Sequence, residues 1–272
     1  MDTGLAGKAV IVTASTSNIG KGIALAFADE GARVVVVGRD EQAGKKAVAS
    51  ALERGAADAM WSRTDMTDRT AIDAMVAATL ERFGAIDILV NNVGGNIGVS
   101  PFELSSPEDW RYDIDLTLMP TLHCTHAVLP HMLERGEGCI INIGSMSAII
   151  GDRMMAVYSS AKGAVHSFTK ILALEVGKRG VRVNAIAPYG TMPEDPHEDT
   201  SSGSRFRPGT GLFAVALANN PEDLAGLARD TALLRPHAKP SEIGAAAVYL
   251  ASGQAAFVTG QILQVDGGVE LP

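Results

Sequence analysis

A tyrosine and a lysine four residues apart are the side chains of this sequence with the clearest capacity for chemistry. Tyr158 and Lys162 lie in a segment with helical periodicity. Residues four apart share one face of a helix, so the phenol and the ammonium group can reach one site. A phenol with an ordinary pKa of about 10 is a poor base at neutral pH, and a nearby cation favours the phenolate. The pair therefore predicts acid–base chemistry.

A serine extends this pair. Ser145 follows a predicted strand at 139–143 and precedes Tyr158 by thirteen residues. Open α/β sheets bind ligands at the carboxyl ends of their strands, and a hydroxyl group there can donate to the same substrate oxygen as the tyrosine. We therefore predict that Ser145, Tyr158 and Lys162 are catalytic, and that Ser145 and Tyr158 contact the substrate.

The elements that must position these residues follow from an alternation of short β-branched runs with longer helical segments. This alternation is typical of parallel strands joined by crossover helices. Strands are predicted at 9–12, 33–37, 59–62, 86–91, 139–143, 181–186 and 262–265, and helices at 19–30, from 106 to about 134, from about 154 to 178 and at 241–251. We predict an α/β fold, Rossmann-like and doubly wound, in which helices flank a seven-stranded parallel sheet in a single domain.

Residues 189–240 interrupt the alternation with six prolines and a polar stretch. Long irregular insertions in compact domains are usually functional lids or disordered segments. The apolar side chains of Met192, Phe206, Leu212 and Phe213 favour a lid. They also favour a small to medium, largely apolar or alicyclic substrate.

The turn after the first strand, 13–20, leads directly into a helix, and backbone amides in this context can hold a pyrophosphate. A glycine fingerprint would have glycine at 14, 18 and 20, and only Gly20 is present. Ala14 can make the turn with a negative φ, whereas Asn18 tolerates a positive φ. Taken alone, the segment also fits an ordinary strand-to-helix turn.

The end of the second strand bears on the choice of dinucleotide. A carboxylate at this position would bind the ribose 2′-hydroxyl of NAD, and Gly38 lacks one. Arg39 offers a planar, charged donor suited to a 2′-phosphate, although a solvated loop arginine is the simpler alternative. NADP(H) is favoured, and NAD(H) stays open.

At these residues the chain resembles the short-chain dehydrogenase/reductase family over nearly its whole length. The matching motifs are the turn 13–20, Asp65, Asn91-Asn92-Val93-Gly94, Ser145, Tyr158 with Lys162, 184–188, and the two segments 259–261 and 265–268. The resemblance implies that the serine polarises the substrate oxygen, that the tyrosine is the acid or base, and that the lysine binds the nicotinamide ribose. The implied cofactor contacts are Thr13, Ser15, Ser17, Asn18, Ile19, Gly20, Arg39, Asp65, Met66, Asn92, Gly94, Tyr158, Lys162, Pro188 and Thr191. A homotetramer or homodimer is implied in the same way.

Two further positions depart from the family pattern. Asp115 stands where the family usually has an asparagine that holds a proton-relay water, and its carboxylate could pair with Lys162 instead. Tyr189 follows Pro188 where a glycine is usual. We expect Asp115 to belong to the catalytic set, and Tyr189 and Met192 to contact the substrate.

Charge and composition exclude other classes. A net charge of −8 over 272 residues disfavours a nucleic-acid or membrane-surface partner, and no apolar stretch approaches the roughly 18 to 20 residues of a membrane span. Two cysteines without metal-ligand spacing and no visible signal peptide favour a cytoplasmic protein. His123, Cys124 and His126 lack partners for a zinc site, so no metal is predicted.

The sequence thus predicts an NADP(H)-dependent oxidoreductase that transfers a hydride between nicotinamide and a ketone or secondary alcohol. A 3-oxoacyl-thioester reductase for acyl-carrier-protein or coenzyme A substrates is an alternative, which would need a basic docking patch near the insertion; Arg205 and Arg207 are the candidates. An NAD-dependent alcohol dehydrogenase of the hydroxysteroid type is another. The intact serine, tyrosine and lysine argue against a non-catalytic dinucleotide-binding protein.

Overall fold

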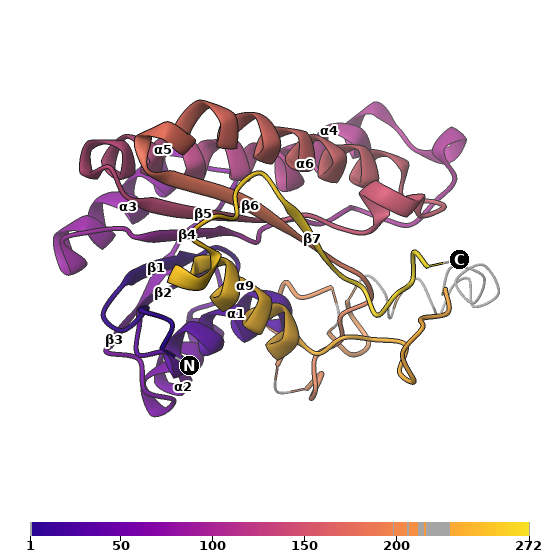
Figure 1. Cartoon of the computed structure of the whole chain (residues 1–272). Helices are drawn as coiled ribbons and strands as arrows, with labels where there is room; N and C mark the ends of the chain where they lie inside the picture. Colours follow the sequence, from indigo (N-terminus) through magenta and orange to yellow (C-terminus); the bar gives the residue numbers. More distant parts are fainter. Residues whose placement is uncertain (1, 198, 206, 212–214, 216–228, 272) are drawn as a thin grey trace.

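Seven parallel strands form one sheet in the order β3-β2-β1-β4-β5-β6-β7 (Figure 1). The structure is a computed structural model that describes residues 2–197, 199–205, 207–211, 215 and 229–271. The strands are β1 (Ala9–Val12), β2 (Arg33–Gly38), β3 (Asp58–Arg63), β4 (Ile88–Asn91), β5 (Gly138–Ile143), β6 (Val181–Pro188) and β7 (Ile262–Val265). The predicted α/β fold and its seven-stranded sheet are confirmed.

Helices cover both faces of the sheet (Figure 1). The described α-helices are α1 (Asn18–Asp29), α2 (Glu41–Glu53), α3 (Arg69–Phe83), α4 (Pro107–Thr117), α5 (Met119–Arg135), α6 (Ala156–Val176) and α9 (Pro240–Ala251). Helices α1, α2 and α9 lie on one side of the sheet, and α3, α4, α5 and α6 lie on the other. No described helix is both long and apolar enough to cross a membrane.

The strands are buried on both faces because successive side chains of a strand point to opposite sides. In β1, Val10 and Val12 belong to the apolar core under α1 and α9. Their neighbours Ala9 and Ile11 belong to the core under α3, α5 and α6. The uninterrupted apolar run 34–37 in β2 therefore serves both cores at once, as is typical of parallel sheets.

The single helix predicted from 106 to about 134 is wrong. The chain instead forms α4 and α5, which are separated at Leu118. Pro120 has no N–H to donate to the carbonyl four residues earlier, and a proline ring crowds that carbonyl. The predicted start is confirmed by a capping box, in which the Ser106 hydroxyl accepts the N–H of Asp109 and the Asp109 carboxylate accepts the N–H of Ser106.

The direction and order of the strands determine which edge of the sheet carries the candidate site. Strand order reverses between β1 and β4, and open parallel sheets bind ligands at such a reversal, beyond the carboxyl ends of the strands. The turn 13–20, Gly94 and Ser145 follow β1, β4 and β5 at this edge.

Candidate active site

Tyr158 and Lys162 lie at the start of α6, and Lys162 reaches the end of β5, the strand that Ser145 follows. Tyr158 is the third residue of α6, and Lys162 follows one turn later. The Lys162 ammonium nitrogen lies 5.9 Å from the centre of the Tyr158 ring and donates a hydrogen bond of 2.6 Å to the carbonyl of Ile143 at the end of β5. The cation is thus held against the phenol by the backbone of the strand that Ser145 follows.

Burial sets the charge state of this lysine. Its side chain is buried, and loss of hydration, together with the nearby charge of Arg205, lowers the pKa of Lys162 to about 7. A buried ammonium group loses its proton more readily because a low-dielectric surrounding disfavours the charged form. Lys162 can therefore gain or release a proton near neutral pH, which a surface lysine does not.

Ser145 is oriented by two neighbours. Its hydroxyl oxygen accepts hydrogen bonds from the backbone N–H of Ser147 at 3.1 Å and from the Ser147 hydroxyl at 2.9 Å. Its backbone N–H donates to the Nε2 atom of His166 at 3.4 Å. The Ser145 oxygen is the acceptor in both of these hydrogen bonds, so its own hydroxyl proton can be donated to a substrate.

His166 was not identified from the sequence. It is buried one helical turn after Lys162, and burial and the charges of Lys162 and Lys170 lower the pKa of His166 to about 4. The ring is therefore neutral and can accept the Ser145 N–H. A Cβ atom at Gly144 would lie 2.0 Å from the ring, so this position requires glycine. The sequence feature that could have identified His166 is its spacing of four residues from Lys162, which places both side chains on one face of a helix.

The structure does not bring Asp115 to the catalytic lysine. Asp115 is exposed on α4 and forms no hydrogen bond or ion pair with any described residue. Thr117 instead flanks Gly94 together with Lys162. The Thr117 hydroxyl donates to the carbonyl of Gly95 at 2.7 Å and accepts its N–H at 3.1 Å. A threonine thus fastens the strand-end loop where we expected an acidic relay residue.

The turn after β1 has the backbone of a glycine fingerprint without all of its glycines. Ala14 has φ +50° and Asn18 has φ +41°, so the negative φ expected for Ala14 is wrong. Gly20 is required, because a Cβ there would lie 2.2 Å from the carbonyl oxygen of Ala14 and 2.5 Å from the amide nitrogen of Asn92. This close packing holds the start of α1 in the conformation of a pyrophosphate-binding turn, so the backbone fits a dinucleotide once the insertion no longer covers the Asn18 amide.

We expect Ala14→Gly to raise the free energy of unfolding by about 0.5 to 1 kcal/mol, because the left-handed region costs an L-residue about 1 kcal/mol. Urea unfolding measures the change. Ala49→Gly is the matched control: Ala49 is exposed in α2, and glycine in a helix interior destabilises by about 1 kcal/mol. A loss of stability in both variants would contradict the strain assigned to Ala14.

Some predicted cofactor residues hold the protein together instead. The Ser15 hydroxyl donates to the carbonyl of Val12 and accepts the N–H of Val37, and so joins β1 to β2. The Thr13 hydroxyl accepts the N–H groups of Asn92 and Val93. Ser15 and Thr13 therefore shape the cleft, and any contact with a dinucleotide is left to their backbone atoms.

The predicted adenosine end is arranged around an exposed arginine. A guanidinium nitrogen of Arg39 lies 3.8 Å from a carboxylate oxygen of Asp65, and both side chains are exposed. Hydrogen bonds from Thr67, with a smaller contribution from Arg39, lower the pKa of Asp65. Met66 is buried beside it. A Cβ at Gly38 would lie 2.6 Å from the Thr16 methyl group, so a side chain at this strand end would require Thr16 to shift.

The segment after β6 borders the same edge. Pro188 ends β6 and is buried, and the Thr191 hydroxyl donates to the carbonyl of Tyr189 at 2.8 Å. The Tyr189 hydroxyl accepts the N–H of Arg229 at 3.0 Å, and Met192 is 39% exposed. Phe206, Leu212 and Phe213, on which the apolar lid was partly predicted, lie outside the described residues.

Part of the insertion covers the cofactor turn. The backbone N–H of Asn18 donates to the carbonyl of Asp199 at 3.1 Å, and the Lys21 ammonium group lies 2.6 Å from the Asp199 carboxylate. The N–H of Ser202 donates to Asp40 at 3.0 Å. A pyrophosphate at the Asn18 amide therefore requires the Asp199 carbonyl to withdraw from that amide.

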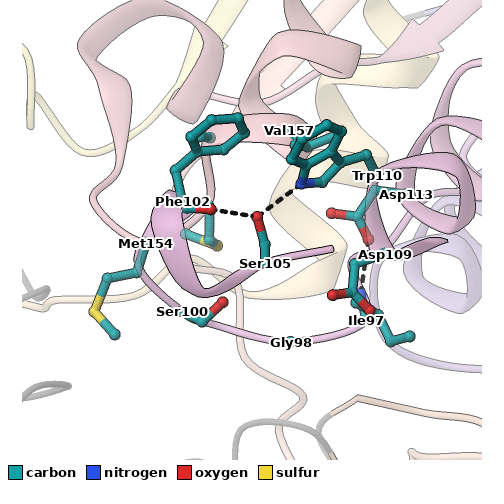
Figure 2. A pocket seen from close by; sticks show the side chains of 12 residues that line it. Ile97, Gly98, Ser100, Phe102, Ser105, Asp109, Trp110, Asp113, Met154 and Val157 are labelled. Carbon is teal, nitrogen blue, oxygen red and sulfur yellow. Dashed lines mark hydrogen bonds between the residues drawn. The ribbon is translucent and has the colours of Figure 1, made fainter. Parts of the chain in front are cut away.

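A pocket opens directly before Tyr158 in the sequence (Figure 2). It is lined by Ile97, Gly98, Ser100, Phe102, Ser105, Asp109, Trp110, Asp113, Met154, Met155, Ala156 and Val157. The rings of Phe102 and Trp110 stack with centres 5.1 Å apart, and the Ser105 hydroxyl accepts the indole N–H of Trp110. The buried carboxylate of Asp113 accepts the N–H of Ile97 at 2.8 Å. The pocket combines an aromatic wall with polar groups, but its volume is only about 40 Å³ and Ser145, Tyr158 and Lys162 do not line it, so it does not mark the substrate site.

Comparison with protein families agrees with this geometry. The family described as "short chain dehydrogenase" matches residues 8–201. The chain belongs to this family. A second family, described as "Enoyl-(Acyl carrier protein) reductase", matches residues 211–270 of the short-chain dehydrogenase. The protein is therefore an oxidoreductase that acts on alcohol or carbonyl groups with a nicotinamide dinucleotide.

The names of relatives of this short-chain dehydrogenase specify a sugar, a cyclohexadiene carboxylate and a steroid. It is 37% identical to an L-fucose dehydrogenase of Oryctolagus cuniculus, over 98% of this chain and 86% of that one. It is 34% identical to a 1,6-dihydroxycyclohexa-2,4-diene-1-carboxylate dehydrogenase of Pseudomonas putida, over 96% and 92%. Among solved structures, a 7α-hydroxysteroid dehydrogenase complexed with NADH and 7-oxo glycochenodeoxycholic acid has a TM-score of 0.82 and 32% identity, over 97% and 94%.

Proposed function

We propose that this short-chain dehydrogenase interconverts a ketone and a secondary alcohol with NADP(H), and that Ser145, Tyr158 and Lys162 carry the reaction. The observation that carries the proposal is the position of Lys162, which lies beside Tyr158 and donates to the end of β5, the strand that Ser145 follows. There, Lys162 is buried 5.9 Å from the Tyr158 ring centre, and the Ser145 hydroxyl keeps its own proton for a substrate.

Each residue has one task in the direction of reduction. Ser145 donates a hydrogen bond to the carbonyl oxygen and polarises it. Tyr158 gives its phenolic proton to the same oxygen as negative charge develops there. The Lys162 cation stabilises the resulting phenolate. A bound nicotinamide supplies the hydride in this direction and accepts it in the other.

An absorbance assay with NADPH and NADH over a panel of alicyclic ketones, a hydroxysteroid, L-fucose and an acetoacetyl thioester, run in both directions, tests this proposal. We expect turnover of at least one alicyclic ketone or alcohol. Turnover of the thioester alone would instead favour the acyl-reductase alternative. No hydride transfer with any member of the panel would contradict the proposed function.

A small to medium, apolar or alicyclic substrate is the finer part of the proposal. Two relatives whose names specify ring-shaped substrates, a cyclohexadiene carboxylate and a steroid, support it. The steroid relative is complexed with NADH, which keeps the NAD-dependent alternative open to the same assay.

The preference for NADP(H) rests on the end of β2. Gly38 provides no carboxylate at this strand end, so the usual recognition of the NAD ribose is missing there. Arg39 is exposed beside it, and a guanidinium group binds a phosphate through parallel hydrogen bonds. These features support binding of a 2′-phosphate by Arg39.

We expect Arg39→Ala to raise the KM for NADPH by about 10- to 100-fold and to change the KM for NADH by less than about threefold, since only NADPH carries the 2′-phosphate. Steady-state kinetics with each cofactor measures this. Arg54→Ala is the matched control, because Arg54 is an exposed arginine that pairs with Asp29 at the other end of α2. Equal changes in both KM values would contradict the role given to Arg39.

Two further predictions belong to this proposal. Residues 189–240 act as a substrate lid within a single domain, and the contacts of Asp199 with Lys21 and Asn18 support this role. Assembly into a dimer or tetramer stays a prediction. Ile171 and Leu174, exposed on α6, are apolar side chains that such an interface would cover.

A further inference from the structure

One arginine of the insertion reaches the catalytic tyrosine. The segment 199–205 is fastened at its start by the ion pair between Asp199 and Lys21 and by the hydrogen bond from Ser202 to Asp40. It continues into the site, where the central guanidinium carbon of Arg205 lies 5.6 Å from the centre of the Tyr158 ring. Arg205 thus faces the group that would exchange a proton with the substrate.

The surroundings of Arg205 hold its side chain in this place. Its guanidinium group donates a hydrogen bond to the side-chain oxygen of Asn96. Its stem passes Gly95, where a Cβ atom would lie 3.5 Å from the Arg205 Cδ. The side chain is half-buried, and its neighbour Arg207 is exposed. The two arginines that we considered together as a docking patch therefore have different environments.

The charges around Arg205 favour an anion. Burial lowers the pKa of Arg205, and its interactions with Tyr158 and the charge of Asp113 partly offset this change. A guanidinium group nevertheless keeps its charge at neutral pH. Arg205 and Lys162 thus both lie beside the phenol, with the Arg205 guanidinium carbon 5.6 Å and the Lys162 nitrogen 5.9 Å from the centre of the Tyr158 ring. Asp113, the carboxylate that attracts Arg205, also accepts the N–H of Ile97.

A substrate carboxylate suits this position, because the Arg205 guanidinium group lies beside the tyrosine that would reach the reacting oxygen. Carboxylates pair with arginine through two parallel hydrogen bonds, which fix orientation as well as charge. We propose that Arg205 binds a carboxylate group of the substrate, which makes the substrate a hydroxy acid, or the matching oxo acid, with its carboxylate one or two carbons from the reacting carbon. The short separation follows from the position of Arg205 beside Tyr158, since the tyrosine must reach the reacting oxygen while the arginine holds the carboxylate.

The carboxylate takes no part in the bond changes. On oxidation, the carbinol C–H bond breaks and its hydride passes to the oxidised dinucleotide. The O–H proton passes to the Tyr158 phenolate, and the C–O bond becomes a carbonyl. Arg205 therefore fixes which face and which hydroxyl group of a ring-shaped acid approach Tyr158. This inference rests on the proposed hydride transfer and changes its substrate from a wholly apolar ring compound to one that carries a carboxylate.

The test compares an acid with its neutral analogue. The probes are cis- and trans-2-hydroxycyclohexane-1-carboxylate and the corresponding carboxamides, oxidised by the full chain with saturating NADP⁺ and, separately, NAD⁺. We expect kcat/KM for an acid to exceed that for its amide by about 30-fold or more in the wild type. Arg205→Met should reduce this ratio at least about tenfold, and Arg205→Lys should reduce it less, because a lysine keeps the charge without the planar fork.

Arg207→Met is the matched control and should leave the ratio of acid to amide unchanged, since Arg207 is exposed. A ratio near one in the wild type, or an unchanged ratio in Arg205→Met, would overturn the assignment of a carboxylate while leaving the proposed dehydrogenase function in place. Turnover of neither acids nor amides, nor of any other alcohol in the panel given above, would overturn both. Circular dichroism of each variant separates a lost contact from a lost fold.

Discussion

Replacing Tyr158 by phenylalanine is expected to lower kcat by about 1,000-fold or more while cofactor affinity changes by less than about threefold. The substitution removes only the phenolic hydroxyl, so the ring that lies 5.9 Å from the Lys162 nitrogen and 5.6 Å from the Arg205 carbon stays in place. Without the phenolic hydroxyl, the charge that develops on the substrate oxygen has lost its proton donor.

Single-turnover kinetics and NADPH fluorescence titration measure the two effects separately. Tyr249→Phe is the matched control, because Tyr249 lies on α9 and is 43% exposed; its kcat should equal that of the wild type. Activity of Tyr158→Phe within tenfold of the wild type would show that another group transfers the proton, and the catalytic assignment would then be abandoned.

The fold was predictable because its signals are local. The apolar run 34–37 is a strand covered on both faces, and both cores use it. Gly31 follows the end of α1 and has φ +70°. Glycine often adopts this left-handed conformation directly after a helix. The break between α4 and α5 was also readable, since Pro120 cannot continue a helix begun at Pro107; the long apolar periodicity around it masked the signal.

The site was less predictable, because parts of it depend on helix rotation. Asp115 and Thr117 are two residues apart on α4, and two residues turn a helix by about 200°. We expected Asp115 to face the site, but its side chain is exposed. Thr117, two positions further along α4, is the buried one. Tyr158 and Lys162 escaped this error because a spacing of four fixes their relative direction.

Arg205 could not be placed from the sequence at all. It lies 47 positions after Tyr158, inside an insertion with no periodic pattern, and its position depends on contacts such as Asp199 with Lys21. Such contacts join segments far apart in the chain, and no local propensity specifies them. Residues of this kind are also the ones that distinguish one substrate from another, since loops carry specificity on a shared scaffold.

Lys162→Met is expected to lower kcat/KM by about 100-fold or more and, at the same time, to stabilise the ligand-free protein. The catalytic loss follows from removing the cation that stabilises the Tyr158 phenolate. The gain in stability follows from burial: folding moves the pKa of Lys162 from its ordinary 10.5 to about 7, which corresponds to a penalty on the charged form of roughly 5 kcal/mol at most. Loss of the hydrogen bond to Ile143 offsets part of this, leaving a gain of about 2 kcal/mol.

The dependence of this gain on pH identifies its cause. Below pH 7 the lysine is charged in both the folded and the unfolded wild type, so the folded state carries the full penalty. Between pH 7 and 10.5 the unfolded chain binds more protons than the folded one, so the stability of the wild type rises with pH and the advantage of Lys162→Met shrinks.

Urea unfolding at pH 6, 8 and 10 measures this trend. Lys170→Met, which replaces an exposed lysine of the same helix, is the control and should show no such trend. A variant less stable than the wild type at pH 6 would mean that the cation stabilises the fold. If the variant is more stable than the wild type at pH 6, the buried charge lowers stability, which is the trade between activity and stability expected of a catalytic group.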